Sequence, residues 1–241
     1  MSNISFTRSP VAITTLLLVS SMLVSACDST EPADTTFTFD FDRGPQGFVA
    51  GFADYPPGVL PDFKMVSDHR ALPAPLESRS GLFIAGTNHS LDLFMFFKGP
   101  IDGLPPGQYE ATVSLEIATE VPAGCFGIGA PPGESVTVKA GATEVEPLPV
   151  LEGSYLRMNI DVGNGNSGGT QAVAFGDITN SRQCETPFQW ELKSFEAQTI
   201  PSTVSVSSDG RAWILIGTDS SGFAGRTRIY FTRVSVTFAP I

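Results

Sequence analysis

The chain has few of the residues on which common catalytic and metal sites depend. Its 241 residues include only two histidines, three cysteines and two tryptophans. His69 and His89 both stand beside polar segments, so we expect exposed loop side chains rather than members of a catalytic triad. The cysteines form neither a Cys-x-x-Cys pair nor a Cys/His ligand spacing, which argues against a zinc site.

Basic residues are also scarce. The chain has 14 Lys and Arg against 25 Asp and Glu, a formal net charge of −11. Nucleic-acid binding draws much of its affinity from Lys and Arg on phosphates, so we expect no nucleic-acid partner. The acidity is consistent with solubility outside the cell or with cation binding.

No hydrophobic run is long enough to span a bilayer, which takes about 20 apolar residues. The uncharged stretch 11–24 suits the core of a signal peptide instead. Leu23-Val24-Ser25-Ala26-Cys27 follows it and resembles the bacterial lipobox. The resemblance implies cleavage after residue 26 and acylation of Cys27, and thus a protein anchored to a membrane of the cell envelope on its extracytoplasmic side. The alternative is an ordinary secretory signal peptide in which Cys27 is incidental.

Setting Cys27 aside leaves an even pair of cysteines, Cys125 and Cys184. In an oxidising compartment we expect them to form a disulfide. That bond would close a loop of about 60 residues and stabilise the fold by about 4 kcal/mol through chain entropy.

The secondary-structure signal has a period of two. Residues 37–41 and 109–117 alternate apolar and polar side chains, as strands with one buried face do. Residues 91–97 and 213–216 are mostly apolar on both faces, as central strands are. Pro/Gly-rich turns separate these segments, and no segment of 12 residues keeps a helical spacing. The chain is therefore predicted to be all-β.

The last strand carries an irregularity. Ile229 and Phe231 lie at odd positions, whereas Val234, Val236 and Phe238 lie at even ones. A β-bulge near Thr232-Arg233 would bring both sets to the core side.

We predict a signal peptide at 1–26, a polar tether at 27–35 and one antiparallel β-sandwich of jelly-roll type at 36–241. Three segments carry a resemblance to galactose-binding-like jelly rolls, of which carbohydrate-binding modules are one branch. They are Phe37-Thr38-Phe39-Asp40-Phe41, Ile101-Asp102-Gly103-Leu104-Pro105-Pro106-Gly107-Gln108-Tyr109 and Thr227-Arg228-Ile229-Tyr230-Phe231.

Sugar binding requires exposed aromatic faces beside planar polar side chains. Two segments supply such residues, and the candidates are Asp54, Tyr55, Asn88, His89 and Asp92. The alternative is that these aromatic residues hold long loops against the sandwich.

A third segment, residues 161–169, is rich in glycine and in oxygen ligands. Asp161, Asn164 and Asn166 are candidate Ca²⁺ ligands, although the spacing is not that of an EF-hand. The same composition suits a turn in which Asn and Gly adopt positive φ.

The sequence favours a non-catalytic module that binds a glycan or an envelope protein. Two alternatives remain. A cell-envelope hydrolase of glycosidase type would need two carboxylates facing each other across a cleft. A structural lipoprotein would act through protein contacts alone.

Overall fold

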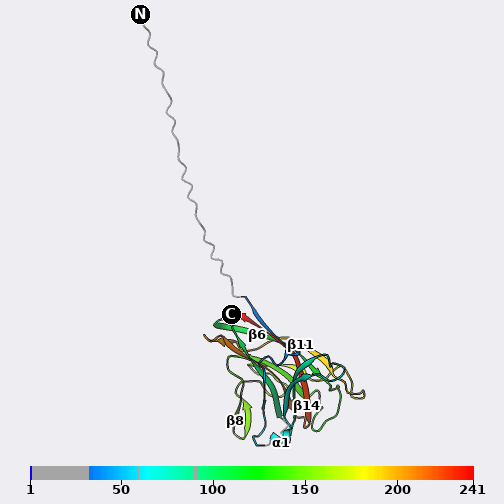
Figure 1. Ribbon diagram of the computed structural model, residues 1–241. Helices are drawn as coiled ribbons and strands as arrows, with labels where there is room; N and C mark the ends of the chain where they lie inside the picture. Colours follow the sequence, from blue (N-terminus) through cyan, green and yellow to red (C-terminus); the bar gives the residue numbers. More distant parts are fainter. Residues whose placement is uncertain (2–32, 59, 90–91) are drawn as a thin grey trace. The chain divides into compact units, whose positions relative to one another are not determined.

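The computed structural model describes residues 1, 33–58, 60–89 and 92–241 (Figure 1). The chain divides into two units, Met1–Glu31 and the compact unit Pro32–Ile241. The expected signal peptide and Cys27 lie outside the described residues and stay predictions. Within the described part of the chain, no helix is long and apolar enough to cross a membrane.

The described secondary structure is almost entirely strand. The elements are β1 (Thr35–Asp40), η1 (Phe41–Arg43), β2 (Val49–Ala53), α1 (Leu60–Phe63), β3 (Val66–Ala71), β4 (Ser80–Thr87), β5 (Asp92–Asp102), β6 (Gly107–Thr119), β7 (Val136–Thr143), β8 (Pro149–Glu152), β9 (Tyr155–Met158), β10 (Ala172–Asp177), β11 (Glu191–Thr199), β12 (Val204–Val206), β13 (Arg211–Ser221) and β14 (Arg226–Pro240).

The strands form two large antiparallel sheets that pack face to face. The seven-stranded sheet has the order β11-β6-β14-β4-β3, with β1 paired to β14 and β12 to β6. The five-stranded sheet has the order β10-β7-β13-β5-β2. The chain passes from one sheet to the other between β1 and β2, β2 and β3, β4 and β5, β5 and β6, β6 and β7, β10 and β11, β12 and β13, and β13 and β14. The predicted all-β sandwich is confirmed.

One core fills the space between the sheets, and a second lies outside the five-stranded sheet. In β5, Leu93 and Met95 face the first core, while Phe94 and Phe96 face the second. All four side chains are at most 1% exposed, which confirms the prediction of a strand covered on both faces. The outer core matters for function because the segment that covers it also builds the pocket described below.

The predicted bulge in the last strand is present. The pairing of β14 with β6 shifts register between Phe231 and Arg233, so Ile229, Phe231 and Val234 are all fully buried. The extra residue, Thr232, is buried as well, and its hydroxyl lies 2.8 Å from Glu116 Oε1. A bulge changes which alternate residues face the core. This one brings the apolar residues at odd positions before it and at even positions after it to the core side.

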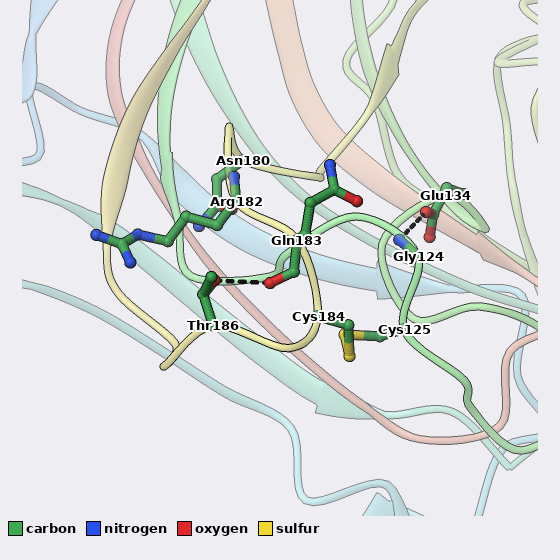
Figure 2. Close-up of a disulfide and its surroundings, with 8 residues drawn as sticks. All are labelled: Gly124, Cys125, Glu134, Asn180, Arg182, Gln183, Cys184 and Thr186. Atoms are coloured by element: carbon green, nitrogen blue, oxygen red, sulfur yellow. Dashed lines mark hydrogen bonds between the residues drawn. A yellow bond between two sulfur atoms is a disulfide. The ribbon is translucent and has the colours of Figure 1, made fainter.

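Cys125 and Cys184 form the predicted disulfide (Figure 2). It joins the loop after β6 to the loop before β11, and Ala123 and Gln183 form a bridge beside it. Hydrogen bonds hold each loop locally, from Gly124 N to Glu134 Oε1 and from Thr186 Oγ1 to the Gln183 carbonyl (Figure 2). Because such bonds persist in oxidising compartments, the disulfide indicates an extracytoplasmic protein.

Candidate functional site

The segment between β7 and β10 covers the outer face of the five-stranded sheet. It contains the hairpin β8–β9, whose two-residue turn uses Gly153 at φ 61°. Beyond the hairpin, Ile160 and Val162 pack onto Phe94, Phe96 and other residues of the sheet's outer face. This apolar contact fixes the covering segment, whose polar side chains then line a pocket at its edge.

The pocket is open and has a volume of about 190 Å³. It brings together residues from two segments that sequence reasoning treated separately: Asp54 and Asp92 from the sugar-binding candidates, and Asp161 and Asn164 from the calcium candidates. The full lining is Asp54, Asp92, Glu152, Arg157, Met158, Ile160, Asp161, Val162, Gly163 and Asn164.

Arg157 joins the two candidate carboxylates. Its Nη1 donates to Asp54 Oδ1 at 2.7 Å and to Asp92 Oδ2 at 3.0 Å. Its guanidinium carbon lies 5.0 Å from the ring centroid of Tyr155, two residues earlier on β9. Alternate residues of a strand share a face, so the hairpin places the ring and the guanidinium together. The ring supports the guanidinium, and the guanidinium fixes both carboxylates.

Asp54 is held in an unusual backbone conformation. Its φ is 63°, in the left-handed region that few residues besides Gly, Asn and Asp adopt readily. Its N–H donates to the Leu156 carbonyl at 2.6 Å, so β9 fixes its position. Burial raises the pKa of the Asp54 carboxyl, the Asp92 charge adds to that rise, and the hydrogen bond from Arg157 opposes it.

Asp161 organises the glycine-rich loop. Its Oδ1 accepts from Gly163 N at 3.0 Å, and its Oδ2 accepts from Thr170 N and Oγ1 at 2.8 and 3.0 Å. These bonds, that from Thr170 N foremost, lower the pKa of its carboxyl. Gly163 has φ 72°, and a Cβ there would lie 2.3 Å from Ser167 O. The loop therefore depends on glycine at this position.

The calcium hypothesis stays a prediction. Asn164 lines the pocket with Asp161, whereas Asn166 lines a different hollow with Ser135 and Ser221. Among the residues that the structure describes, no group of three or more His, Cys, Asp or Glu side chains is arranged to hold a metal ion.

A buried ion pair lies beneath the pocket. Lys139 Nζ donates to Asp219 Oδ2 at 2.8 Å and to the Val162 carbonyl at 3.0 Å. Burial raises the pKa of Asp219 to about 6, although the Lys139 charge opposes that shift; the carboxylates of Asp92 and Asp54 add to it. The pair therefore ties the pocket loop to the sheet and lies within the field of the pocket carboxylates.

The remaining sugar-binding candidates lie elsewhere. Tyr55 is 6% exposed and packs against Phe63 in the main core, so its ring is not available as a platform. Asn88 is buried, and its Nδ2 donates to the Ser220 carbonyl at 2.9 Å. His89 Nε2 lies 3.0 Å from the Asp62 carbonyl oxygen. Asn88 thus connects β4 to β13, and His89 contacts α1.

Two further features bear on nucleophilic catalysis. Gly165-Asn166-Ser167-Gly168-Gly169 matches the Gly-x-Ser-x-Gly pattern, but Ser167 is exposed in a loop and not in a strand-to-helix turn. His69 lies in β3, not in the loop expected for it, and its Nε2 is 2.6 Å from the Phe41 carbonyl oxygen. This serine motif therefore lacks the structural context of a nucleophile elbow.

Sequence reasoning missed Tyr155, Arg157 and Lys139. The hairpin that carries the first two has a signal in the sequence, because Gly153-Ser154 stands between two short apolar stretches, Val150-Leu151 and Tyr155-Leu156. Nothing near Lys139 in the sequence distinguishes it from a solvent-facing lysine between valines and alanines.

No protein-family model and no curated protein matches the sequence. Among solved structures, the chain is similar to a carbohydrate-binding module studied for its promiscuous specificity, at 13% identity and a TM-score of 0.40. That match covers 80% of this chain and 58% of the other, so the chain spans just over half of that protein's length.

Two other solved structures show how broad the likeness is. A family 11 carbohydrate-binding module of a cellulosomal cellulase of Clostridium thermocellum is 7% identical, with coverage of 87% and 97% and a TM-score of 0.36. The structure of infectious bursal disease virus is 9% identical, with coverage of 87% and 33% and a TM-score of 0.30. At these identities the likeness concerns the β-sandwich fold alone.

Proposed function

We propose that the protein is a non-catalytic glycan-binding module that acts outside the cytoplasm and is held at a membrane through acylated Cys27. Its ligand site is the pocket of Arg157, Asp54 and Asp92. The observation that carries the proposal is the pair of hydrogen bonds from Arg157 Nη1 to both carboxylates.

The pocket offers both kinds of contact that a sugar needs. Saccharides present hydroxyl groups at the ring edge and C–H groups on the ring faces. The fixed carboxylates of Asp54 and Asp92 supply acceptors, and the guanidinium of Arg157 supplies donors. Met158 and Ile160 supply apolar surface in the same lining.

The same arrangement disfavours glycosidic hydrolysis. A glycosidase acid must give its proton to the leaving oxygen, and its partner carboxylate must attack the sugar or activate a water. Here one guanidinium nitrogen bonds both carboxyl groups and holds them as hydrogen-bond acceptors. The arrangement therefore suits recognition better than proton transfer.

A glycan array with the purified full-length protein in detergent tests the proposal, followed by calorimetry on the glycans that bind. Arg157→Met removes the bridging donor, and we expect its affinity to fall by about tenfold or more. Arg211→Met is the matched control, because Arg211 pairs with Asp102 at the surface, 2.8 Å apart, on residues outside the pocket. Its affinity should be unchanged.

Three outcomes would contradict the proposal. The wild-type protein could bind no glycan, the two variants could lose affinity equally, or the wild-type protein could release reducing sugar from a bound glycan. The last result would favour the hydrolase. Circular dichroism of each variant separates loss of binding from loss of folding.

A further inference from the structure

We infer that the pocket selects a glycan whose sugar carries a protonated amine. The inference rests on the proposed function and names the class of ligand: an amino sugar with a free ammonium group, in preference to a neutral or acidic sugar.

The charges of the lining carry the first part of the inference. Four carboxylates line the pocket, those of Asp54, Asp92, Glu152 and Asp161, against the single guanidinium of Arg157. Arg157 serves two of them, and Asp161 accepts from its own loop. Glu152 is exposed and pairs with Tyr155 through the backbone at the hairpin turn, but its side chain forms no hydrogen bond or ion pair with the described residues. The lining is therefore negative overall after its internal pairing.

The residues beneath the pocket do not correct this imbalance. Lys139 is fully buried and is matched by Asp219, so the pair adds no net positive charge. Asp219 is 1% exposed, and its Oδ1 is a buried acceptor without a hydrogen-bond partner in the described structure. The carboxylates of Asp54 and Asp92 raise the pKa of Asp219, as a surplus of negative charge in the pocket would. Asp219 does not line the pocket and is paired with Lys139, so the negative charge of the lining stays uncompensated from below.

The hydrogen bonds that the carboxylates already accept indicate which kind of cation the pocket can bind. A calcium ion needs six to eight oxygen atoms converging on one point. Both oxygens of Asp161 are instead committed to main-chain and hydroxyl donors, and no described cluster is arranged for a metal. An ammonium group needs only two or three acceptors around its N–H groups. A sugar uronate would meet like charges here and be repelled.

Two oligosaccharides of equal length test the inference: a hexamer of glucosamine and a hexamer of N-acetylglucosamine. They differ in charge at the nitrogen and share the ring. With the full-length protein in detergent at pH 6, we expect the glucosamine hexamer to bind about tenfold more tightly, and its affinity to fall as salt rises.

Glu152→Gln isolates the charge, because this exposed side chain can change without disturbing a packed region. We expect it to weaken glucosamine-hexamer binding several-fold and to weaken binding of the acetylated hexamer much less. Glu110→Gln is the control, since Glu110 is an exposed residue of β6 in the other sheet. It should alter neither affinity.

Failure of the inference differs from failure of the proposed function. Equal affinity for the two hexamers, or preference for the acetylated one, would overturn the ammonium inference while glycan binding stands. Equal displacement of the glucosamine hexamer by hexalysine would also overturn it, because charge without a sugar would then suffice. Absence of binding to every glycan on the array would overturn the proposed function itself.

Discussion

Lys139 and Asp219 form an ion pair in which the side chains are 0% and 1% exposed, with Nζ 2.8 Å from Oδ2. Lys139 comes from β7 and Asp219 from the adjacent strand β13. The same Nζ donates to the carbonyl of Val162, a residue of the pocket lining. The pair therefore links strands β7 and β13 to the loop that lines the pocket. Its removal should lower the stability of the fold and disturb the position of that loop.

Loss of one partner should be costly. Lys139→Met leaves the Asp219 carboxylate buried without its cation, and we expect the free energy of unfolding to fall by about 3–5 kcal/mol. Urea unfolding followed by intrinsic fluorescence measures the change. The double variant Lys139→Met, Asp219→Leu removes both charges and should recover most of the loss. Equal destabilisation of the single and double variants would show that packing, not charge, holds this site.

Asp219 should impose a pH dependence on stability. Its folded-state pKa is raised to about 6, chiefly by burial, while an unfolded Asp titrates near 3.9. Between these values the folded state binds a proton that the unfolded state releases, so the contribution of Asp219 to stability falls as pH rises from about 4 to about 6.

The test compares the free energy of unfolding of wild type and Asp219→Asn at pH 4, 5, 6 and 7. We expect the difference between the two proteins to shift in favour of the variant as pH rises through that window. A constant difference would assign the pH dependence to other carboxyls.

The disulfide should stabilise the fold through the unfolded state. Replacing both Cys125 and Cys184 by serine opens a loop with a sequence separation of 59 residues, and we expect a loss of about 4 kcal/mol. Chemical denaturation of the variant and of the reduced wild-type protein should give the same lower stability. A reduced protein as stable as the oxidised one would contradict this account.

Cys27 should decide where the protein is found. In cells that process lipoproteins, we expect wild type in the detergent phase of the membrane fraction and Cys27→Ala in the soluble fraction, because acyl chains supply the membrane affinity. Ser25→Thr, which alters a neighbouring position and retains the thiol, is a useful comparison. Retention of Cys27→Ala in the detergent phase would show that the lipobox assignment is wrong.

Much of the architecture could be predicted from the sequence because these local patterns each correspond to one backbone arrangement. Alternation in 109–117 predicted a strand with one buried face, and β6 has Val113, Leu115 and Ile117 in the core. The shift between odd and even residues around Thr232 predicted a bulge, since only an added residue turns both sets inward. The Cys125–Cys184 disulfide could be predicted from the number of cysteines, because assigning Cys27 to the lipid leaves one pair.

The site was less accessible to sequence reasoning because it joins distant segments. Asp54 and Arg157 are 103 residues apart, and Asp92 and Arg157 are 65 apart. No local sequence pattern predicts that the hairpin β8–β9 folds back over β2 and β5. Tyr55 shows the converse: an aromatic residue in a Pro-rich loop suits a binding surface, yet the main core takes up its ring.

The disulfide has a consequence for survival among proteases. β7, the hairpin, the glycine-rich loop and β10 all lie between Cys125 and Cys184. A single peptide-bond cleavage anywhere in that stretch leaves both fragments covalently joined, so the nicked molecule migrates as one species until it is reduced. Because the outer apolar cluster also holds the covering segment on the sheet, a nicked protein keeps the two walls of its pocket on one covalent molecule.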